Sequence, residues 1–338
     1  MRAIVYEKTG DSDVLWLAER PVPEPGPGEV RVRVVRSGVN PTDWKSRRGR
    51  LEFPEAVPNQ DGSGVVDAVG PGVEGLRPGE RVWLWEAAWQ RPGGTAQEYV
   101  VLPERQAVPL PDGASFDLGA SLGIPALTAH RCLTVADGGP DRLAPGALDG
   151  RTVLVAGGAG AVGNAAVQLA RWAGAVVVTT VSSEEKAALA RAAGASHVVN
   201  YREEDAAGAI RAAAPDGIDI VVEVAPGPNA ELDAAVLAPD GVVAVYANTG
   251  GDEITVRVRD LFTRNIRYQF VLVYTVTEAA KLAAVEDVSA AVAAGAIRVG
   301  AEAGLPLHRF PLERTAEAHD AVEAGTVGKV LVDVAGDE

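Results

Sequence analysis

Cysteine is almost absent from this sequence, whose 338 residues include one, Cys132. A disulfide within the chain is therefore impossible, and a zinc site built from several cysteines is excluded by counting. Cys132 lies in PALTAHRCL, which has the pattern of a helix. We therefore expect it to be a core residue rather than a nucleophile.

Long apolar runs and positive charge are also scarce. No stretch of about 20 apolar residues occurs, and the N-terminal MRAIVYEKTG lacks the apolar run of a signal peptide. A formal net charge of -15 would repel nucleic acid and anionic membranes. We expect a cytoplasmic protein whose partners are small molecules or copies of itself, with neither nucleic acid nor membrane among them.

The pattern of the sequence changes once along the chain. Up to about residue 122, short strand-like segments alternate with turns such as PGPGE and RPGE, which predicts a mainly antiparallel β domain. From about residue 150, apolar runs such as TVLVA, AVVVTTV and IDIVVEV alternate with amphipathic helices, as in a parallel sheet covered on both faces. The elements after RNIRYQFVLVY are too few for a third domain. We therefore predict a β-rich domain from 1–123 and 269–338, and a doubly wound α/β domain from 124–268.

A glycine-rich loop follows the strand TVLVA and opens the helix AVGNAAVQLARWAG. Its glycines are Gly158, Gly160 and Gly163, with the spacing GxGxxG. This spacing allows a tight turn, brings the backbone against a pyrophosphate and places that phosphate at the N-terminus of a helix. The loop therefore predicts dinucleotide binding.

The end of the next strand indicates which dinucleotide is bound. An acidic residue there would bind the ribose 2′-hydroxyl of NAD. AVVVTTV ends instead at Ser182 and Ser183, and Lys186 follows one turn later. These groups suit the 2′-phosphate of NADPH, although Ser182 could also cap the next helix with Glu185 as its capping-box partner.

Among nicotinamide enzymes, short-chain reductases use a Tyr-x-x-x-Lys pair, and no tyrosine of this sequence has Lys four residues on. The chain instead resembles the medium-chain dehydrogenase/reductase superfamily. The segments GIPALTAHRCL, LVAGGAGAVGNAAVQLAR, TVSSEEKAALARAAGASHVVNYREED and GIDIVVEV are similar to the zinc-independent quinone oxidoreductases, the zeta-crystallin-like branch. The resemblance covers nearly the whole chain. It implies a GroES-like catalytic domain, a Rossmann domain, an active site in the cleft between them, and a homodimer paired edge to edge through RNIRYQFVLVY.

The resemblance also assigns residues to the cofactor. It places Asn40 near the nicotinamide ribose, Thr128 beside the nicotinamide ring, and Tyr201 with Lys186 at the 2′-phosphate. The remaining cofactor positions are the backbone of Ala161 and Val162 at the pyrophosphate, and Asn248.

The zinc positions of metal-dependent relatives are changed in this sequence. Those relatives carry Cys where this chain has Asn40, and a His-Glu pair where it has Gln60-Asp61. Asn and Gln are poor zinc ligands. We therefore expect no metal, and an activated acceptor such as a quinone or an enone, whose oxyanion hydrogen-bond donors can stabilise.

Lys45 and two tryptophans are candidate substrate contacts. Lys45 lies where zeta-crystallin-like relatives usually have Tyr, so we predict that it stabilises the oxyanion or fixes the cofactor, with Asn40 as its catalytic neighbour. Asp43 is expected to be a local cap. Trp44 and Trp89 are candidates to stack on a planar substrate, and Trp89 is the preferred one.

The predicted function is NADPH-dependent, metal-free reduction of quinones or α,β-unsaturated carbonyls. Two alternatives remain open. One is an enoyl-thioester reductase of lipid or polyketide synthesis, and the other is a noncatalytic dinucleotide-binding protein.

Overall fold

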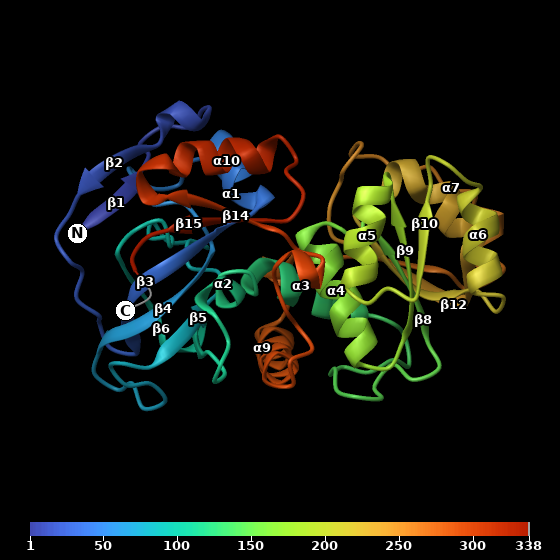
Figure 1. Ribbon diagram of the computed structural model, residues 1–338, viewed down its shortest axis with the longest axis horizontal. Helices are drawn as coiled ribbons and strands as arrows, with labels where there is room; N and C mark the ends of the chain where they lie inside the picture. The colour runs from blue at the N-terminus through green and yellow to red at the C-terminus, as the bar shows by residue number, and fades with distance from the viewer. Residues whose placement is uncertain (337–338) are drawn as a thin grey trace. The chain divides into compact units, whose positions relative to one another are not determined.

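The computed structural model describes residues 1–336 and divides the chain into two compact units (Figure 1). Unit 1 contains Met1–Ile124 and the segment that begins at Leu307. Unit 2 is Pro125–Pro306. The first boundary thus lies one residue from the predicted one.

A seven-stranded sheet forms the centre of unit 1, in the order β14-β15-β3-β4-β5-β7, with β6 paired to β3. Strands β14 and β15 are parallel, and the other neighbours are antiparallel. β1 and β2 form a separate two-stranded sheet. The strands are β1 (Arg2–Val5), β2 (Trp16–Glu19), β3 (Glu29–Val39), β4 (Asp61–Val69), β5 (Arg81–Leu84), β6 (Tyr99–Pro103), β7 (Ala107–Pro109), β14 (Leu307–Pro311) and β15 (Lys329–Asp333), and the helices are α1 (Pro41–Arg48), α2 (Phe116–Gly119) and α10 (Thr315–Glu323).

Strand β3 shows why these segments form a sheet around a core. Its sequence EVRVRVVRSGV alternates, and Val30, Val32 and Val34 are fully buried in the apolar core of unit 1. β15 pairs with β3 in the register Val330 to Val39, so the end of the chain lies beside a strand from its beginning. The apolar positions of both strands thereby share one core.

Residues 41–48 of the polar segment VNPTDWKSRR form the helix α1. Asn40 is the N-cap of α1, and its backbone N–H donates to the Asp43 carboxylate over 2.7 Å. Pro41 occupies the first helical position, where a missing N–H has no cost. The helix ends at the C-cap Gly49. The pattern Asn-Pro-x-Asp is therefore a helix start, and Asp43 is the local cap that we predicted.

Unit 2 contains a six-stranded parallel sheet in the order β10-β9-β8-β11-β12-β13, which confirms the predicted Rossmann-type fold. Its elements are α3 (Gly123–Leu133, which begins in unit 1), β8 (Thr152–Ala156), α4 (Ala161–Trp172), β9 (Val176–Val181), α5 (Glu184–Ala192), β10 (His197–Asn200), α6 (Ala206–Ala213), β11 (Ile218–Glu223), α7 (Pro226–Val236), β12 (Leu237–Val245), α8 (Val258–Phe262), β13 (Arg267–Phe270) and α9 (Glu278–Ala293).

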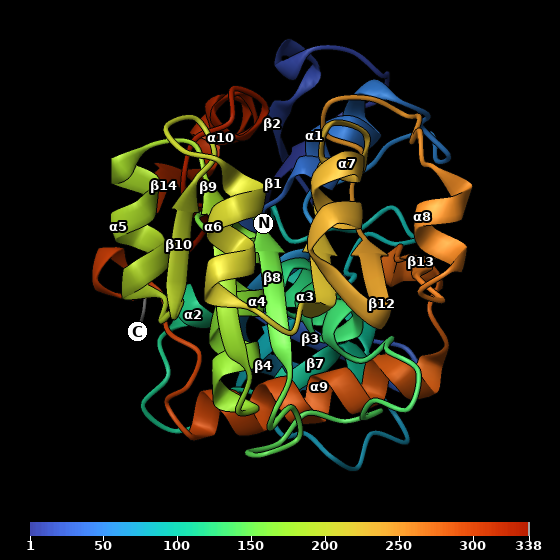
Figure 2. The ribbon, with the colours of Figure 1, turned by 90° about the vertical axis from the view of Figure 1, so that its right-hand side faces the viewer.

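Helices cover both faces of this parallel sheet. Figure 1 shows β8, β9 and β10 between α4 with α5 on one side and α6 with α7 on the other, and Figure 2 shows α6 and α7 in front of the strands. Leu154, Val178 and Val221 pack with residues of α6 and α7 in one apolar cluster. Because helices cover both faces of the sheet, side chains on both sides of each strand are buried, and the strand sequences are therefore continuous apolar runs.

The predicted return of the chain at residue 269 differs from the structure, in which unit 1 resumes at Leu307. The segment between these positions is held by unit 2 through buried polar contacts. His130 bonds Asp287 of α9 over 2.8 Å, and Asn164 of α4 donates to the carbonyl of Ala303 over 2.9 Å. Such long-range side-chain contacts cannot be read from local pattern, so the boundary was placed too early.

No helix within residues 1–336 combines the length and the hydropathy that crossing a membrane requires.

Candidate active site

A buried polar network in unit 1 occupies the ends of three neighbouring strands. Asn40 follows β3, Asp61 begins β4, and Lys329 begins β15. The pairing of β3 with both β4 and β15 brings the three side chains together. Their residue exposures are 2%, 0% and 1%, so every polar atom needs a partner within the protein.

The hydrogen bonds of this network hold the Asn40 carboxamide from both sides. Lys329 Nζ donates to Asn40 Oδ1 over 2.7 Å, and Asn40 Nδ2 donates to Asp61 Oδ2 over 2.7 Å. Lys329 Nζ also lies 3.5 Å from the same Asp61 oxygen. The amide group of Asn40 has two N–H donors, and the bond to Asp61 uses one of them.

Two glycines create the space around the Asp61 carboxylate. A Cβ on Gly123 would lie 2.1 Å from Asp61 Oδ1, and a Cβ on Gly38 would lie 3.2 Å from the Asp61 Cβ. The backbone N–H of Ile124 donates to Asp61 Oδ1 over 2.9 Å. Asp61 is therefore fixed by α3 on one oxygen and by Asn40 and Lys329 on the other.

Burial moves the charged groups of this cluster toward their neutral forms. Burial raises the pKa of Asp61, against the opposing effects of Lys329 and Asn40. Burial likewise lowers the pKa of Lys329, against the attraction of Asp61 and Asp43. The pKa of Asp43 is raised to about 8 by burial, against the hydrogen bond from the Asn40 backbone. Two carboxyls thus share one ammonium, and Asp43 is the carboxyl that holds its proton near neutral pH.

A second chain of buried hydrogen bonds fixes Asn59. His319 Nε2 bonds Asn59 Oδ1 over 2.9 Å, and Asn59 Nδ2 donates to Ser37 Oγ over 2.9 Å. Burial lowers the pKa of His319 to about 3, so its ring is neutral and Nε2 is the donor to Asn59. This chain supports the wall of a neighbouring pocket.

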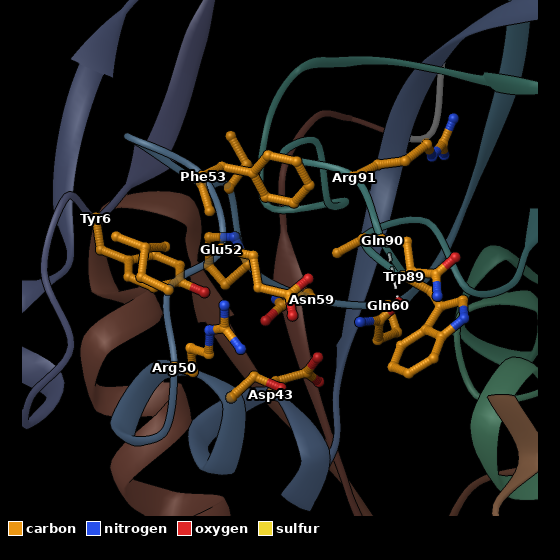
Figure 3. A pocket seen from close by; sticks show the side chains of 16 residues that line it. Tyr6, Asp43, Arg50, Glu52, Phe53, Asn59, Gln60, Trp89, Gln90 and Arg91 are labelled. Atoms are coloured by element: carbon orange, nitrogen blue, oxygen red, sulfur yellow. Dashed lines mark hydrogen bonds between the residues drawn. The ribbon is translucent and has the colours of Figure 1, made fainter. Parts of the chain in front are cut away.

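That pocket lies entirely within unit 1 and has a volume of about 230 Å³. Figure 3 shows Tyr6 and Arg50 on one side of it and Trp89 with Gln60 on the other. Gln60 Oε1 accepts a hydrogen bond of 3.1 Å from the backbone of Ala88. Phe53 and Leu51 add apolar surface. The pocket therefore combines aromatic walls with a few polar groups, as small-molecule sites do.

The predicted substrate contacts are separated by the structure. Trp89 lines the pocket, whereas Trp44 does not. Lys45 is exposed, and its Nζ lies 5.8 Å from the centre of the Trp44 ring, outside the residues that line the pocket. The prediction of a chemical role for Lys45 remains a prediction. Trp83 and Trp85 are core residues, with exposures of 0% and 2%.

The glycine loop of unit 2 has the close backbone packing that a dinucleotide site needs. A Cβ on Gly163 would lie 2.4 Å from the Gly157 carbonyl oxygen, and a Cβ on Gly158 would lie 2.2 Å from Thr179 Oγ1. Gly160 is the N-cap of α4, whose first residues are Ala161 and Val162. Their backbone N–H groups have no partner in the helix and are available to a phosphate. These residues fit a dinucleotide.

The predicted 2′-phosphate residues meet at the carboxyl ends of β9 and β10. Lys186 Nζ donates to Ser182 Oγ over 3.0 Å. Tyr201 is half-exposed, and its backbone N–H donates to the carbonyl of Val181 at the end of β9. The helix cap differs from the Ser182 alternative, because Ser183 is the N-cap of α5 and accepts from the backbone of Lys186. Ser182 is therefore free of the capping role.

Two other predicted cofactor residues lie elsewhere in unit 2. Asn248 follows β12, is exposed, and donates from Nδ2 to Asp252. Thr128 is buried in α3, with an exposure of 5%.

Sequence reasoning missed Lys329, Tyr6 and Arg50. Lys329 had a detectable signal, because a lysine begins the apolar strand segment KVLVD near the chain end. Tyr6 and Arg50 carry no such signal, since a tyrosine after a strand and an arginine after a helix are ordinary. Within residues 1–336, no three His, Cys, Asp or Glu side chains gather into a metal-binding group. Asn40 and Gln60 carry neutral amide groups, which are poor zinc ligands, so the donor set at these two positions does not fit zinc.

Comparison with known proteins places both units in families. A model described as the alcohol dehydrogenase GroES-like domain matches residues 26–112, and one described as zinc-binding dehydrogenase matches residues 161–301. The quinone oxidoreductase of Rattus norvegicus is 31% identical over 343 residues, covering 98% of this chain and 97% of the relative. A solved NAD-dependent alcohol dehydrogenase is 32% identical with a TM-score of 0.85, covering 99% of this chain and 100% of its own. A mycobacterial protein solved with NADPH is 30% identical with a TM-score of 0.81, covering 98% of this chain and 99% of its own.

Proposed function

Because the chain belongs to the zeta-crystallin-like quinone oxidoreductase branch of the medium-chain dehydrogenase/reductase superfamily, we propose that it is an NADPH-dependent, zinc-independent reductase of quinones or α,β-unsaturated carbonyls. The observation that carries this proposal is the buried Lys329–Asn40–Asp61 network. It puts the Asn40 amide where metal-dependent relatives carry Cys, with the Lys329 ammonium bonded to it, so activation of an ordinary alcohol has no Lewis acid to rely on.

The phosphate-binding groups support NADPH over NADH. Lys186 and Ser182 are hydrogen-bonded at the tip of β9, and the same tip has no acidic side chain in place of Ser182 or Ser183. An ammonium beside two hydroxyls favours a 2′-phosphate. The Gly158–Gly163 loop would hold the pyrophosphate, and Tyr201 would cover the phosphate end.

The bound nicotinamide would supply a hydride to an electron-poor carbon of the acceptor. The residues of this chain position the acceptor and stabilise the negative charge that develops on its oxygen. Asn40 can donate its remaining N–H from an orientation that Lys329 and Asp61 hold fixed. Trp89 provides a flat wall in the pocket of unit 1, and Lys45 is the further proposed donor.

A homodimer is part of the proposal. Strand β13 is the edge of the parallel sheet and pairs with β12 on its other side. Phe270 and Leu272, at and just beyond its end, are exposed by 64% and 54%. An edge strand with exposed apolar residues favours pairing with a second copy. Sedimentation of the chain as a monomer at micromolar concentration would count against this pairing.

The test of the proposed reaction is consumption of NADPH or NADH with one panel of quinones, enones and enoyl thioesters. We expect turnover of quinones or enones with NADPH and weaker turnover with NADH. Turnover of enoyl thioesters alone would favour a role in lipid or polyketide synthesis. If NADPH fails to quench the protein fluorescence, the protein does not bind this cofactor and the reductase proposal is wrong.

A further inference from the structure

The pocket of unit 1 contains a cation with no protein partner. Arg50 lines the pocket from the turn after α1, and its guanidinium makes no hydrogen bond or ion pair with any residue that the structure describes. Arg91, the other arginine in the wall, donates to the carbonyls of Ala87 and Val101. In Figure 3 the head group of Arg91 turns away from the pocket, whereas that of Arg50 points into it. Arg50 is therefore the cation that the pocket presents to a ligand.

Tyr6 adds a second free donor. It follows β1 and lines the same side of the pocket as Arg50 (Figure 3). Its hydroxyl also has no hydrogen-bond partner among residues 1–336. Burial raises the pKa of Tyr6, so the hydroxyl keeps its proton and can donate. The Arg50 guanidinium and the Tyr6 hydroxyl are thus two hydrogen-bond donors on one side of the pocket, and a ligand group with more than one oxygen can accept from both.

The charge of the pocket differs from that of the whole chain. Its wall contains Arg50 and Arg91, with Glu52 and Asp43 as the acidic residues. Because burial raises the pKa of Asp43 to about 8, that carboxyl is mostly protonated at neutral pH. Since the Arg91 head group turns away, Arg50 and the exposed carboxylate of Glu52 are the charged groups that remain in the wall, on a chain whose formal net charge is -15. The pocket therefore lacks the negative charge of the chain as a whole.

The size of the pocket limits the acceptor. Its volume of about 230 Å³ is below the range of roughly 300–1,000 Å³ usual for drug-sized ligands. A single aromatic ring with a short side chain is a suitable size, and Phe53 with Trp89 supplies aromatic walls for it.

We propose that this pocket takes a small enone or quinone that carries an anionic group, which pairs with Arg50 and accepts a hydrogen bond from Tyr6. The inference rests on the proposed reductase function and specifies its substrate class. A planar guanidinium binds a carboxylate with two parallel hydrogen bonds, which a neutral acceptor of the same shape cannot provide.

The test compares one enone with and without the charge. Benzalacetone and its para-carboxylate are assayed with NADPH for the wild type, Arg50→Gln, Tyr6→Phe and the control Arg77→Gln. Arg77 is a suitable control because it is exposed and does not line the pocket. We expect the wild type to prefer the carboxylate in kcat/KM by about tenfold, the effect of one charge-assisted hydrogen bond. Arg50→Gln should bring this ratio close to one, Tyr6→Phe should lower it in part, and Arg77→Gln should keep it.

Direct binding separates this inference from the reductase proposal. Naphthoate, an inert aromatic carboxylate, is titrated against protein fluorescence for the same variants, and Arg50→Gln should bind it about tenfold more weakly. If neither enone turns over but naphthoate binding depends on Arg50, the reductase proposal fails and the anion site stands. A wild-type ratio near one, an unchanged ratio in Arg50→Gln, or naphthoate binding that ignores Arg50 overturns the anion site.

Discussion

The ammonium of Lys329 donates a hydrogen bond of 2.7 Å to the carboxamide oxygen of Asn40, which precedes it by 289 positions in the chain. Both residues are almost fully buried, and Asp61 closes the network. The orientation of a proposed active-site amide is thus set by an ion pair behind it.

Removing the ammonium should destabilise unit 1. Lys329→Met leaves Asp61 buried without its counter-charge, which costs about 3–5 kcal/mol. Urea unfolding followed by tryptophan fluorescence measures the free energy of unfolding. The double variant Lys329→Met with Asp61→Asn should recover part of the loss, because the stranded charge is gone. If Lys329→Met lowers the free energy of unfolding by less than about 1 kcal/mol, the Lys329–Asp61 pair does not stabilise unit 1 as we infer.

Asp43 predicts a specific pH dependence of stability. The pKa of its carboxyl is raised to about 8 in the folded protein, above an unfolded value of about 3.9. The folded state therefore binds more protons between these values, so this contribution to stability is complete below about pH 4 and is lost as pH rises through about 8. Relative to Asp43→Asn, the wild type should lose at most about 1.4 kcal/mol per pH unit in this range. A stability difference between the two proteins that stays constant from about pH 5 to pH 8 would contradict the raised pKa.

Lys186 should decide the preference for NADPH. Lys186→Ala is expected to raise KM for NADPH by about tenfold, through loss of a charge-assisted hydrogen bond, with little change for NADH. Arg191→Ala is the matched control, since Arg191 lies on the same helix and pairs with Glu184. Equal effects of Lys186→Ala on both cofactors would show that no 2′-phosphate is recognised there.

The two loop glycines Gly160 and Gly163 should respond differently to alanine. A Cβ on Gly163 would lie 2.4 Å from the Gly157 carbonyl oxygen, whereas one on Gly160 would lie at an ordinary 3.5 Å from it. Gly163→Ala should therefore lower the melting temperature, by several degrees for a loss of about 1–3 kcal/mol. Gly160→Ala should melt like the wild type and serves as the control for the fold. Equal melting temperatures for both variants would mean that the loop moves to accommodate the added Cβ at Gly163, and the prediction would be wrong.

Lys45 remains the most exposed of the proposed catalytic groups. If it stabilises the acceptor oxyanion, Lys45→Ala should lower kcat by roughly tenfold or more. Arg48→Ala is the control, because Arg48 lies on the same helix and also faces the Trp44 ring, at 5.9 Å. Unchanged turnover and unchanged KM values for both substrates in Lys45→Ala would remove it from the mechanism.

Features that depend on neighbouring residues were predictable from the sequence. The GxGxxG spacing, the apolar runs of the parallel sheet and the serines at the end of β9 are local patterns, and each is found at its expected place in unit 2. The start of the helix over Pro41–Arg48 is equally local, because Asn40, Pro41 and Asp43 form it.

Features that depend on strand pairing were decided by the tertiary structure alone. Trp44 follows the end of β3 and Trp89 follows the end of β5, yet the two side chains have different surroundings. Trp89 lines the pocket, whereas the Trp44 ring lies beside Lys45. The chain returns to unit 1 at Leu307 because buried side chains hold α9 to unit 2 until then. The sequence by itself determined the Rossmann fold and its phosphate loop, since these follow from local spacing and apolar period. Only the pairing of β15 with β3 could place Lys329 beside Asn40, which is distant in the chain. Because both side chains are buried there, each needs a hydrogen-bond partner within the protein, and they bond to each other.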